Sequence, residues 1–279
     1  CSGWCAILAM PAAKCNRALV TIPVTINDAP RDCLFAGADA PDADFIFDAR
    51  VVSVFPDMLH RSVPCWSELV RLIGLTAAHL TAADRSQSAR RDRVTRIYDL
   101  GCSLGATSAS ILARMPDTAV HILAVDNAPA MIDGLRTRLQ QAVADGRVEP
   151  VCADLLDVQV TAARVVVLNL TLQFVQPEQR LALLRRIRQG LVPSGVLILA
   201  EKVVWSEPGS DALMSALHAD FKRAQGYSEL EISRKRAALE RVLIPDAIEI
   251  HEERLRAAGF TRIERFFQCL NFTGWLAWA

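Results

Sequence analysis

The fold of this 279-residue chain is decided by one segment, Asp99-Leu100-Gly101-Cys102-Ser103-Leu104-Gly105. It follows the apolar run Val94–Asp99, which predicts a buried strand, and it precedes a helical stretch that extends to Met115. A glycine-containing turn between a strand and a helix is typical of a doubly wound α/β sheet, in which ligands bind at the carboxyl ends of parallel strands. The segment therefore predicts both a parallel sheet and the position of its binding site.

The rest of the chain continues this alternation of strands and helices. Short apolar runs predict further strands at Val120–Asp126, Val148–Asp154, Arg164–Asn169 and Val196–Glu201. Spacing and terminal signals predict helices from Trp66 onward, after Pro64, and at Pro129–Val143, Pro177–Gly190, Asp211–Arg223, Ser228–Val242 and Asp246–Ala258. Two last runs, Ile263–Gln268 and Asn271–Trp278, predict a hairpin. We expect an α/β fold whose mostly parallel sheet is closed by a C-terminal antiparallel hairpin.

The amino-terminal stretch differs from the rest because it has no sustained period and is interrupted by prolines. We interpret residues 1–43 as a poorly ordered or doubtful leader. Residues 44–279 are then one ligand-binding domain, with a helical insertion at about 207–258.

Composition narrows the functional class. Lys+Arg and Asp+Glu each number 31, so the formal net charge is zero, and 52% of the residues are hydrophobic. A dedicated nucleic-acid binder needs excess positive charge to displace counterions, so we expect no direct nucleic-acid binding. The most apolar runs, such as Val196–Ala200, are far shorter than the roughly 20 residues of a membrane-spanning helix, so we expect no membrane partner.

The eight cysteines are dispersed without a C-x-x-C pair. Cys1, Cys5, Cys15 and Cys33 lie in the leader, and their spacing matches no familiar zinc module. We expect no metal site, and reduced thiols in a cytoplasmic protein.

Two interpretations of the glycine turn fit poorly. The nicotinamide fingerprint G-x-G-x-x-G is broken, because Ser103 and Ala106 stand at glycine positions. The turn also matches the G-x-S-x-G elbow of α/β-hydrolases, with Ser103 as nucleophile. No His-Gly-Gly segment precedes it, and His121, His218 and His251 satisfy the order of a triad only loosely.

A third interpretation, binding of S-adenosylmethionine (SAM), explains more of the sequence. Asp126 ends the second strand 25 residues after Gly101, where a carboxylate can accept both ribose hydroxyls. Asp154 ends the third strand, in position to meet an adenine amino group. Each acid alone is as consistent with a helix N-cap, but three acids at successive strand ends, Asp99 included, favour SAM binding.

Two further polar residues are ambiguous from the sequence. Asn169, at the end of the fourth strand, either satisfies local backbone groups or contacts ligand. Arg236 shares an apolar helical stripe with Ile232, Leu239 and Leu243, in a helix that a capping box starts at Ser228. It either forms an ion pair with a carboxylate such as Glu240 or binds a ligand carboxylate in bidentate fashion.

Beyond these patterns, long blocks of the chain resemble the carboxy-S-adenosyl-L-methionine synthase family, from about Asp44 to Ala277. The resembling blocks are Val54–Met58 through Pro64, Tyr98–Gly105, Ala124–Asn127, Asn169–Phe174, Asp220–Arg223 and Gly226–Ser233. The leader lies outside the resemblance. The resemblance implies a Rossmann-like fold of the SAM-dependent methyltransferase type.

The family resemblance implies an unusual transferase reaction. Enzymes of this family convert SAM and prephenate into carboxy-SAM and phenylpyruvate, and a separate enzyme then uses carboxy-SAM to modify a tRNA wobble uridine. The family is homodimeric, and we expect a homodimer here. The implied small-molecule partners are SAM, as a substrate, and prephenate.

The resemblance also implies roles for individual residues. It assigns the methionyl part of SAM to Gly101, Cys102 and Ser103, the ribose to Asp126 and Asn127, the adenine to Asp154 and Leu155, and the pocket floor to Asn169. Arg236 is expected to bind the new carboxylate, as the catalytic residue. The family has a ligand-contacting Tyr where this chain has Trp66, preceded by Cys65 in place of Gly.

Three alternatives remain open at this stage: a methyltransferase acting on a small carboxylic acid, the Ser103 hydrolase, and a SAM-binding protein without catalysis. The residues that bind prephenate are also open. Arg61, Lys202 and Arg223 are candidates, although surface statistics favour a solvated or ion-paired side chain for each of them.

Overall fold

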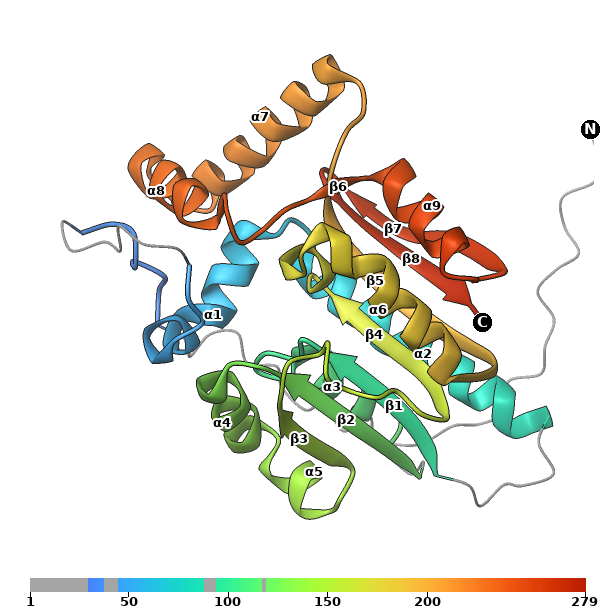
Figure 1. The fold of residues 1–279 in the computed structure, drawn as a ribbon. Helices are drawn as coiled ribbons and strands as arrows, with labels where there is room; N and C mark the ends of the chain where they lie inside the picture. Colours follow the sequence, from blue (N-terminus) through green and yellow to red (C-terminus); the bar gives the residue numbers. More distant parts are fainter. Residues whose placement is uncertain (1–29, 38–44, 88–93, 117–118) are drawn as a thin grey trace, which may run out of the picture.

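The computed structural model describes residues 30–37, 45–87, 94–116 and 119–279 (Figure 1). Within these residues the chain forms an eight-stranded sheet in the order β3-β2-β1-β4-β5-β8-β7, with β6 paired to β5. The strands are β1 (Thr95–Leu100), β2 (Val120–Asp126), β3 (Val148–Cys152), β4 (Ala163–Asn169), β5 (Leu191–Val204), β6 (Asp246–Ala247), β7 (Arg262–Cys269) and β8 (Phe272–Trp278). Only β8 pairs antiparallel with β5 and with β7. The predicted sheet, parallel with an antiparallel hairpin at its end, is confirmed.

Helices cover both faces of the sheet and the carboxyl ends of its strands (Figure 1). They are α1 (Ala49–Ser62), α2 (Trp66–Gln87), α3 (Ala106–Leu112), α4 (Pro129–Arg138), α5 (Gln140–Ala144), α6 (Pro177–Gly190), α7 (Pro208–Ala224), α8 (Glu229–Leu239) and α9 (Ile248–Ala257). A short 3-10 helix, Leu172–Phe174, follows β4. Figure 1 shows α1, α7 and α8 beyond the strand ends, away from the two layers that cover the sheet.

Alternation along the central strands explains the two layers, because successive side chains point to opposite faces. In β4, Val165 and Val167 belong to the apolar cluster that includes α2, α3 and α4. Val166 and Leu168 belong to the cluster on the other face, with α6 and α9. A strand that is buried on both faces reads as a continuous apolar run, which is why these strands are visible in the sequence.

Most predicted elements are confirmed, with two local differences. The helix predicted at Pro129–Val143 is interrupted at Leu139, between α4 and α5. The segment predicted as a helix from Asp246 begins with the two-residue strand β6. The capping box at Ser228 is present, since Ser228 Oγ accepts from the Glu231 N–H while Glu231 accepts from the Ser228 N–H.

Part of the predicted leader packs against the domain. Residues 1–29 and 38–43 lie outside the described residues, but 30–37 are described. In that stretch Asp32 is 1% exposed and Phe35 is 3% exposed. Residues 30–37 therefore contribute to the core that the sequence pattern placed entirely after residue 43.

One buried acidic side chain organises the loop between β4 and α6. Glu201, in β5, accepts the N–H groups of Thr171 at 3.2 Å, Leu172 at 2.7 Å and Gln173 at 3.0 Å. Its complete burial raises its pKa to about 8, against the opposing effect of these three donors and of Arg180. The loop that follows β4 is thereby fixed to the neighbouring strand.

We expect Glu201→Gln to destabilise the protein by about 2 kcal/mol, because the new amide group would face the Gln173 N–H and leave a buried donor unsatisfied. Urea unfolding measures the change. The exposed Glu178→Gln is the matched control, for which we expect less than about 0.5 kcal/mol. Equal stability of the two variants would contradict the role of Glu201.

Candidate functional site

A cavity of about 480 Å³ lies at the carboxyl ends of β1, β2 and β4. Its walls are formed by the β1–α3 turn, the loops after β2, β3 and β4, helix α1, and parts of β5, α7 and α8. This volume is in the range of small-molecule sites. The position is the one that the strand-turn-helix segment predicts.

The β1–α3 turn lines the cavity in a conformation that requires glycine. Gly101 has φ 77°, and a Cβ added there would lie 2.3 Å from a side-chain carbon of Thr171. The N–H groups of Gly101 and Cys102 both donate to Val125 O, at 2.8 and 2.9 Å. The turn is therefore held between β2 and the β4–α6 loop, with its backbone close to the cavity.

Asp99, by contrast, is turned away from the cavity. It is 1% exposed, and it accepts from the Ser108 N–H at 3.1 Å and from the Ser108 hydroxyl at 2.6 Å. Burial raises the pKa of this carboxyl to about 6. Its position at the end of β1 anchors α3 beneath the turn.

The two other strand-end acids line the cavity and also bind backbone. Asp126 accepts from the Ser103 N–H at 2.9 Å and from the Ala128 N–H at 3.0 Å, and burial raises its pKa. Asp154 accepts from the Leu156 N–H at 2.8 Å. Capping and ligand binding are thus not exclusive here, since each carboxylate shapes its loop and still faces the cavity.

Asn169 presents an unsatisfied acceptor in the cavity wall. Its Nδ2 donates to Thr107 Oγ1 at 3.1 Å, while its buried Oδ1 has no hydrogen-bond partner among the described residues. A buried, unpaired carbonyl oxygen costs free energy unless a ligand donates to it. The amide therefore bonds to a side chain and not to local backbone groups, and contact of its Oδ1 with ligand stays a prediction.

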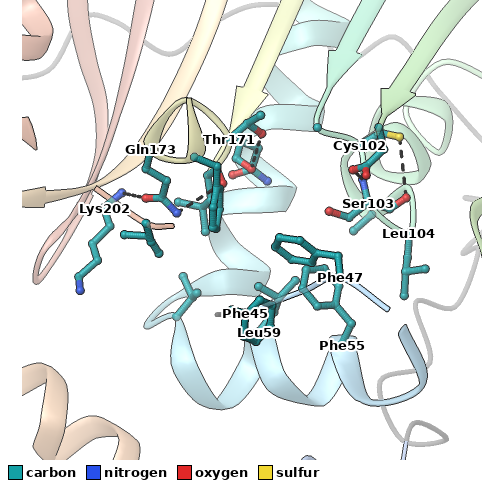
Figure 2. A pocket seen from close by; sticks show the side chains of 18 of the residues that line it. Phe45, Phe47, Phe55, Leu59, Cys102, Ser103, Leu104, Thr171, Gln173 and Lys202 are labelled. Carbon is teal, nitrogen blue, oxygen red and sulfur yellow. Dashed lines mark hydrogen bonds between the residues drawn. The ribbon is translucent and has the colours of Figure 1, made fainter. Parts of the chain in front are cut away.

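The opposite side of the cavity carries cations. Figure 2 shows Lys202 beside Gln173, whose Oε1 accepts the Lys202 N–H at 3.0 Å, and shows Cys102 and Ser103 on the other side. Lys222 and Lys235 also line the cavity. Lys235 is paired, because its Nζ donates to Asp32 at 3.2 Å and to Ser62 Oγ at 2.9 Å.

Between the two sides lies a group of aromatic rings. Phe47 makes edge contacts with Phe45, Phe55 and Phe174, at centroid distances of 5.1, 5.9 and 5.6 Å. Figure 2 shows Phe45, Phe47 and Phe55 together at the floor of the view. These rings give the cavity an apolar wall.

His218 is a neutral structural group at the cationic side. Its Nε2 lies 2.7 Å from Ser62 O, which can only accept, so Nε2 carries the proton. Burial, followed by the charge of Lys222, lowers the pKa of this ring to about 3. His218 therefore adds no charge to the cavity near neutral pH.

No group of three or more His, Cys, Asp or Glu side chains lies in position to hold a metal ion within the described residues. No helix in that part of the chain is long and apolar enough to cross a membrane.

Comparison with known proteins identifies the family. A family model described as a methyltransferase domain matches residues 97–195. The carboxy-S-adenosyl-L-methionine synthase of Geobacter metallireducens is 49% identical over 247 residues, covering 88% of this chain and 97% of the relative. The protein of the same name from Vibrio cholerae is 44% identical over 243 residues, covering 87% and 95%. This chain belongs to the carboxy-S-adenosyl-L-methionine synthase family.

Solved structures support the fold of this synthase family member. The SAM-dependent methyltransferase SibL aligns with a TM-score of 0.52 at 20% identity, over 80% of this chain and 57% of that protein. An O-methyltransferase family protein from Burkholderia thailandensis aligns with a TM-score of 0.53 at 20% identity, over 83% and 60%. The predicted Rossmann-like, SAM-dependent methyltransferase fold is confirmed.

The structure brings most residues expected from the synthase family together. The cavity is lined by Trp66, Gly101, Cys102, Ser103, Asp126, Asn127, Asp154, Leu155 and Asn169. Their roles toward ligand remain predictions.

Arg236 does not lie where the helical stripe places it. Its side chain is exposed and is not among the residues that line the cavity, whereas the preceding Lys235 is 5% exposed. The expected apolar stripe is wrong at this position, because the buried face of α8 is set by the contact of Lys235 with Asp32, from the described part of the leader. Arg236 is still near enough to lower the pKa of Lys202 and Lys222.

Sequence reasoning missed Lys222 and the aromatic wall. The wall includes Phe45 and Phe47, two residues apart at the start of the resembling region, which was a usable signal. Lys222 was missed because the sequence pattern gave no reason to prefer it over the neighbouring Arg223, which was the candidate for prephenate binding in that helix. Arg223 instead pairs with Asp220 and Glu229 at the surface, and Arg61 pairs with Asp57.

The hydrolase alternative gains no support from this geometry. His218 is the only one of the three later histidines that lines the cavity in the described residues, and its Nε2 is occupied by Ser62 O. Ser103 has no histidine among its hydrogen-bond partners there.

We expect the His218 ring to remain neutral between about pH 5 and 8, because burial disfavours its charged form. Nitrogen-15 NMR of the imidazole rings measures the protonation state, and His218→Gln assigns the signal by its loss. A titration midpoint near the ordinary value of about 6.5 would contradict the neutral, structural role.

Proposed function

We propose that this protein converts SAM and prephenate into carboxy-SAM and phenylpyruvate. One observation carries the proposal. In a member of the carboxy-S-adenosyl-L-methionine synthase family, a single cavity joins the glycine turn and strand-end acids of a SAM site to an aromatic wall and a cationic side. The cationic side fits an anionic second substrate, and the aromatic wall fits a six-membered carbocycle.

The acidic side of the cavity fits SAM. The backbone of Gly101 to Ser103 accommodates the methionyl group, and Asn169 Oδ1 supplies an acceptor. Asp126, with Asn127, accepts the ribose hydroxyls, and Asp154, with Leu155, flanks the adenine. Trp66 offers an aromatic face without the hydroxyl of the family Tyr.

The reaction balances without a side-chain base. Prephenate loses its ring carboxylate as CO2 and expels hydroxide, which leaves the aromatic phenylpyruvate. The sulfonium charge acidifies the methyl group of SAM, hydroxide takes a methyl proton to form water, and the resulting carbanion attacks CO2. A new C–C bond gives the carboxymethyl group of carboxy-SAM.

This sequence of steps needs a cavity that retains CO2 and excludes bulk water. The aromatic wall of Phe47, Phe55 and Phe174 supplies such a surface beside the SAM residues. Arg236, which lies near enough to Lys202 and Lys222 to lower their pKa, is proposed to bind the carboxylate of the product by charge.

The wider assignments are part of the same proposal. The product is proposed to serve as the donor for tRNA wobble uridine modification by a separate enzyme. The protein itself is proposed to be a cytoplasmic homodimer that uses only small molecules. The zero net charge of the chain supports the absence of direct nucleic-acid binding.

We expect purified protein with SAM and prephenate to form a nucleoside that is one CO2 heavier than SAM, together with phenylpyruvate. Mass spectrometry of the nucleosides measures this product. Folded protein that binds SAM but forms no such species contradicts the proposed function. Release of S-adenosylhomocysteine in the presence of a carboxylic-acid acceptor would instead support the methyltransferase alternative.

We expect Asp126→Asn to raise the Kd for SAM by about 10- to 100-fold, because a charge-assisted hydrogen bond to ribose is worth about 1.5–3 kcal/mol. Isothermal titration calorimetry measures the Kd. The exposed Asp133→Asn, on α4, is the matched control and should bind SAM normally. An unchanged Kd in Asp126→Asn would contradict the ribose assignment.

A further inference from the structure

Two ammonium groups in the cavity form no ion pair within the part of the chain that the structure describes. Lys202, near the end of β5, and Lys222, in α7, both line the cavity. Neither Nζ forms a hydrogen bond or an ion pair with another residue in the described parts of the chain. Two neighbouring cations do have ion-pair partners: Lys235 pairs with Asp32, and Arg223 pairs with Glu229.

Like charges gather around Lys222. Burial, together with the charges of Lys202, Lys235 and Arg236, lowers the pKa of Lys222 to about 7. The pKa of Lys202 is also lowered, by burial and by Arg236, with Asp211 opposing. Half-buried cations that repel one another in this way lack an anion, and a bound carboxylate would supply it.

The position of Lys202 argues against the methionyl carboxylate of SAM as its partner, and Lys222 lies near enough to Lys202 for the two charges to repel. Figure 2 shows Lys202 on the Gln173 side of the cavity, with the SAM-side residues Cys102 and Ser103 across from it. The aromatic rings of Phe45, Phe47 and Phe55 lie between the two sides in the same view. A second, anionic ligand fits the lysine side.

We propose that Lys202 and Lys222 form the subsite for the 2-oxo carboxylate group of prephenate, the carboxyl donor, which keeps this group when it becomes phenylpyruvate. The ring carboxylate of prephenate, which departs as CO2, then lies against the aromatic wall. This inference rests on the proposed function. The two lysines act by charge, and no covalent bond to them forms or breaks.

The chemistry of decarboxylation explains this division of the donor. An ion pair stabilises a carboxylate in the ground state, and the stabilisation is lost when its charge moves away with the breaking bond. Lysines at the departing carboxylate would therefore slow the reaction, whereas lysines at the retained carboxylate hold the donor at no such cost. The apolar wall of Phe47, Phe55 and Phe174 is suited to the departing group.

The test uses phenylpyruvate, which carries the retained group alone, and isothermal titration calorimetry on SAM-saturated protein. We expect wild type to bind phenylpyruvate and not phenylacetone, which has a methyl group in place of the carboxylate. Lys202→Met and Lys222→Met should each weaken phenylpyruvate binding by about 10- to 100-fold, the size of a charge-assisted hydrogen bond. The Kd for SAM should stay within about twofold of wild type.

Two further variants separate charge from structure. Lys222→Arg keeps the charge and should retain most of the affinity for phenylpyruvate. Arg223→Met, in the same helix but outside the cavity, should bind as wild type does. Thermal unfolding of each variant checks that the fold is intact.

The pH dependence gives an independent readout. The charged or titratable groups around Lys222 are Lys202 on β5, Lys235 and Arg236 on α8, and the neutral His218 on α7. Lys222 loses its proton as the pH rises through about 7, so phenylpyruvate affinity should fall above that pH. Lys222→Arg should move this fall to higher pH, because arginine stays protonated.

Two outcomes would overturn the inference. One is normal phenylpyruvate binding by folded Lys202→Met and Lys222→Met, and the other is a loss of SAM affinity with phenylpyruvate binding unchanged, which would assign the lysines to SAM. Failure of the proposed function is a separate result: wild type would form no carboxy-SAM, while the lysines would still bind phenylpyruvate.

Discussion

The carboxyl group of Glu201 fixes the geometry on which the cavity depends. It accepts three consecutive N–H groups of the β4–α6 loop, so the loop keeps one position relative to β5. Gln173, held in this way, binds the backbone of Lys202. Thr171 packs so closely against Gly101 that no side chain fits there. One buried acid therefore sets the distance between the SAM side and the lysine side of the cavity.

Charges of opposite sign, which cancel over the whole chain, lie in separate parts of the cavity. The chain is neutral, yet Asp126 and Asp154 line one part of the cavity while Lys202 and Lys222 line another. Such a division of charge suits the two ligands of the proposed function, a sulfonium nucleoside and an organic anion. The net charge of the chain does not reveal this local separation.

The fold and half of the site could be predicted because their signals are local. Strands buried on both faces appear as apolar runs, and Gly101, Asp126 and Asp154 follow from the order of strands and turns. Arg236 and Lys235 show the limit. The apolar pattern misplaced the buried face of α8 by one residue. That face includes Lys235, which pairs with Asp32, a residue far away in the sequence. Lys222 was missed for the same reason, since burial and the lack of a counter-ion are tertiary properties.

Periodicity, turn residues and long matching blocks are all read along the chain, so the parallel sheet, its antiparallel hairpin, the glycine turn and the family follow from the amino-acid sequence alone. The set of cations that face the cavity is known only from the folded structure. Lys202, Lys222 and Lys235 come from three different elements, and Asp32 neutralises one of them. Whether a charge is paired depends on groups that folding brings together across hundreds of residues, and no local pattern records it.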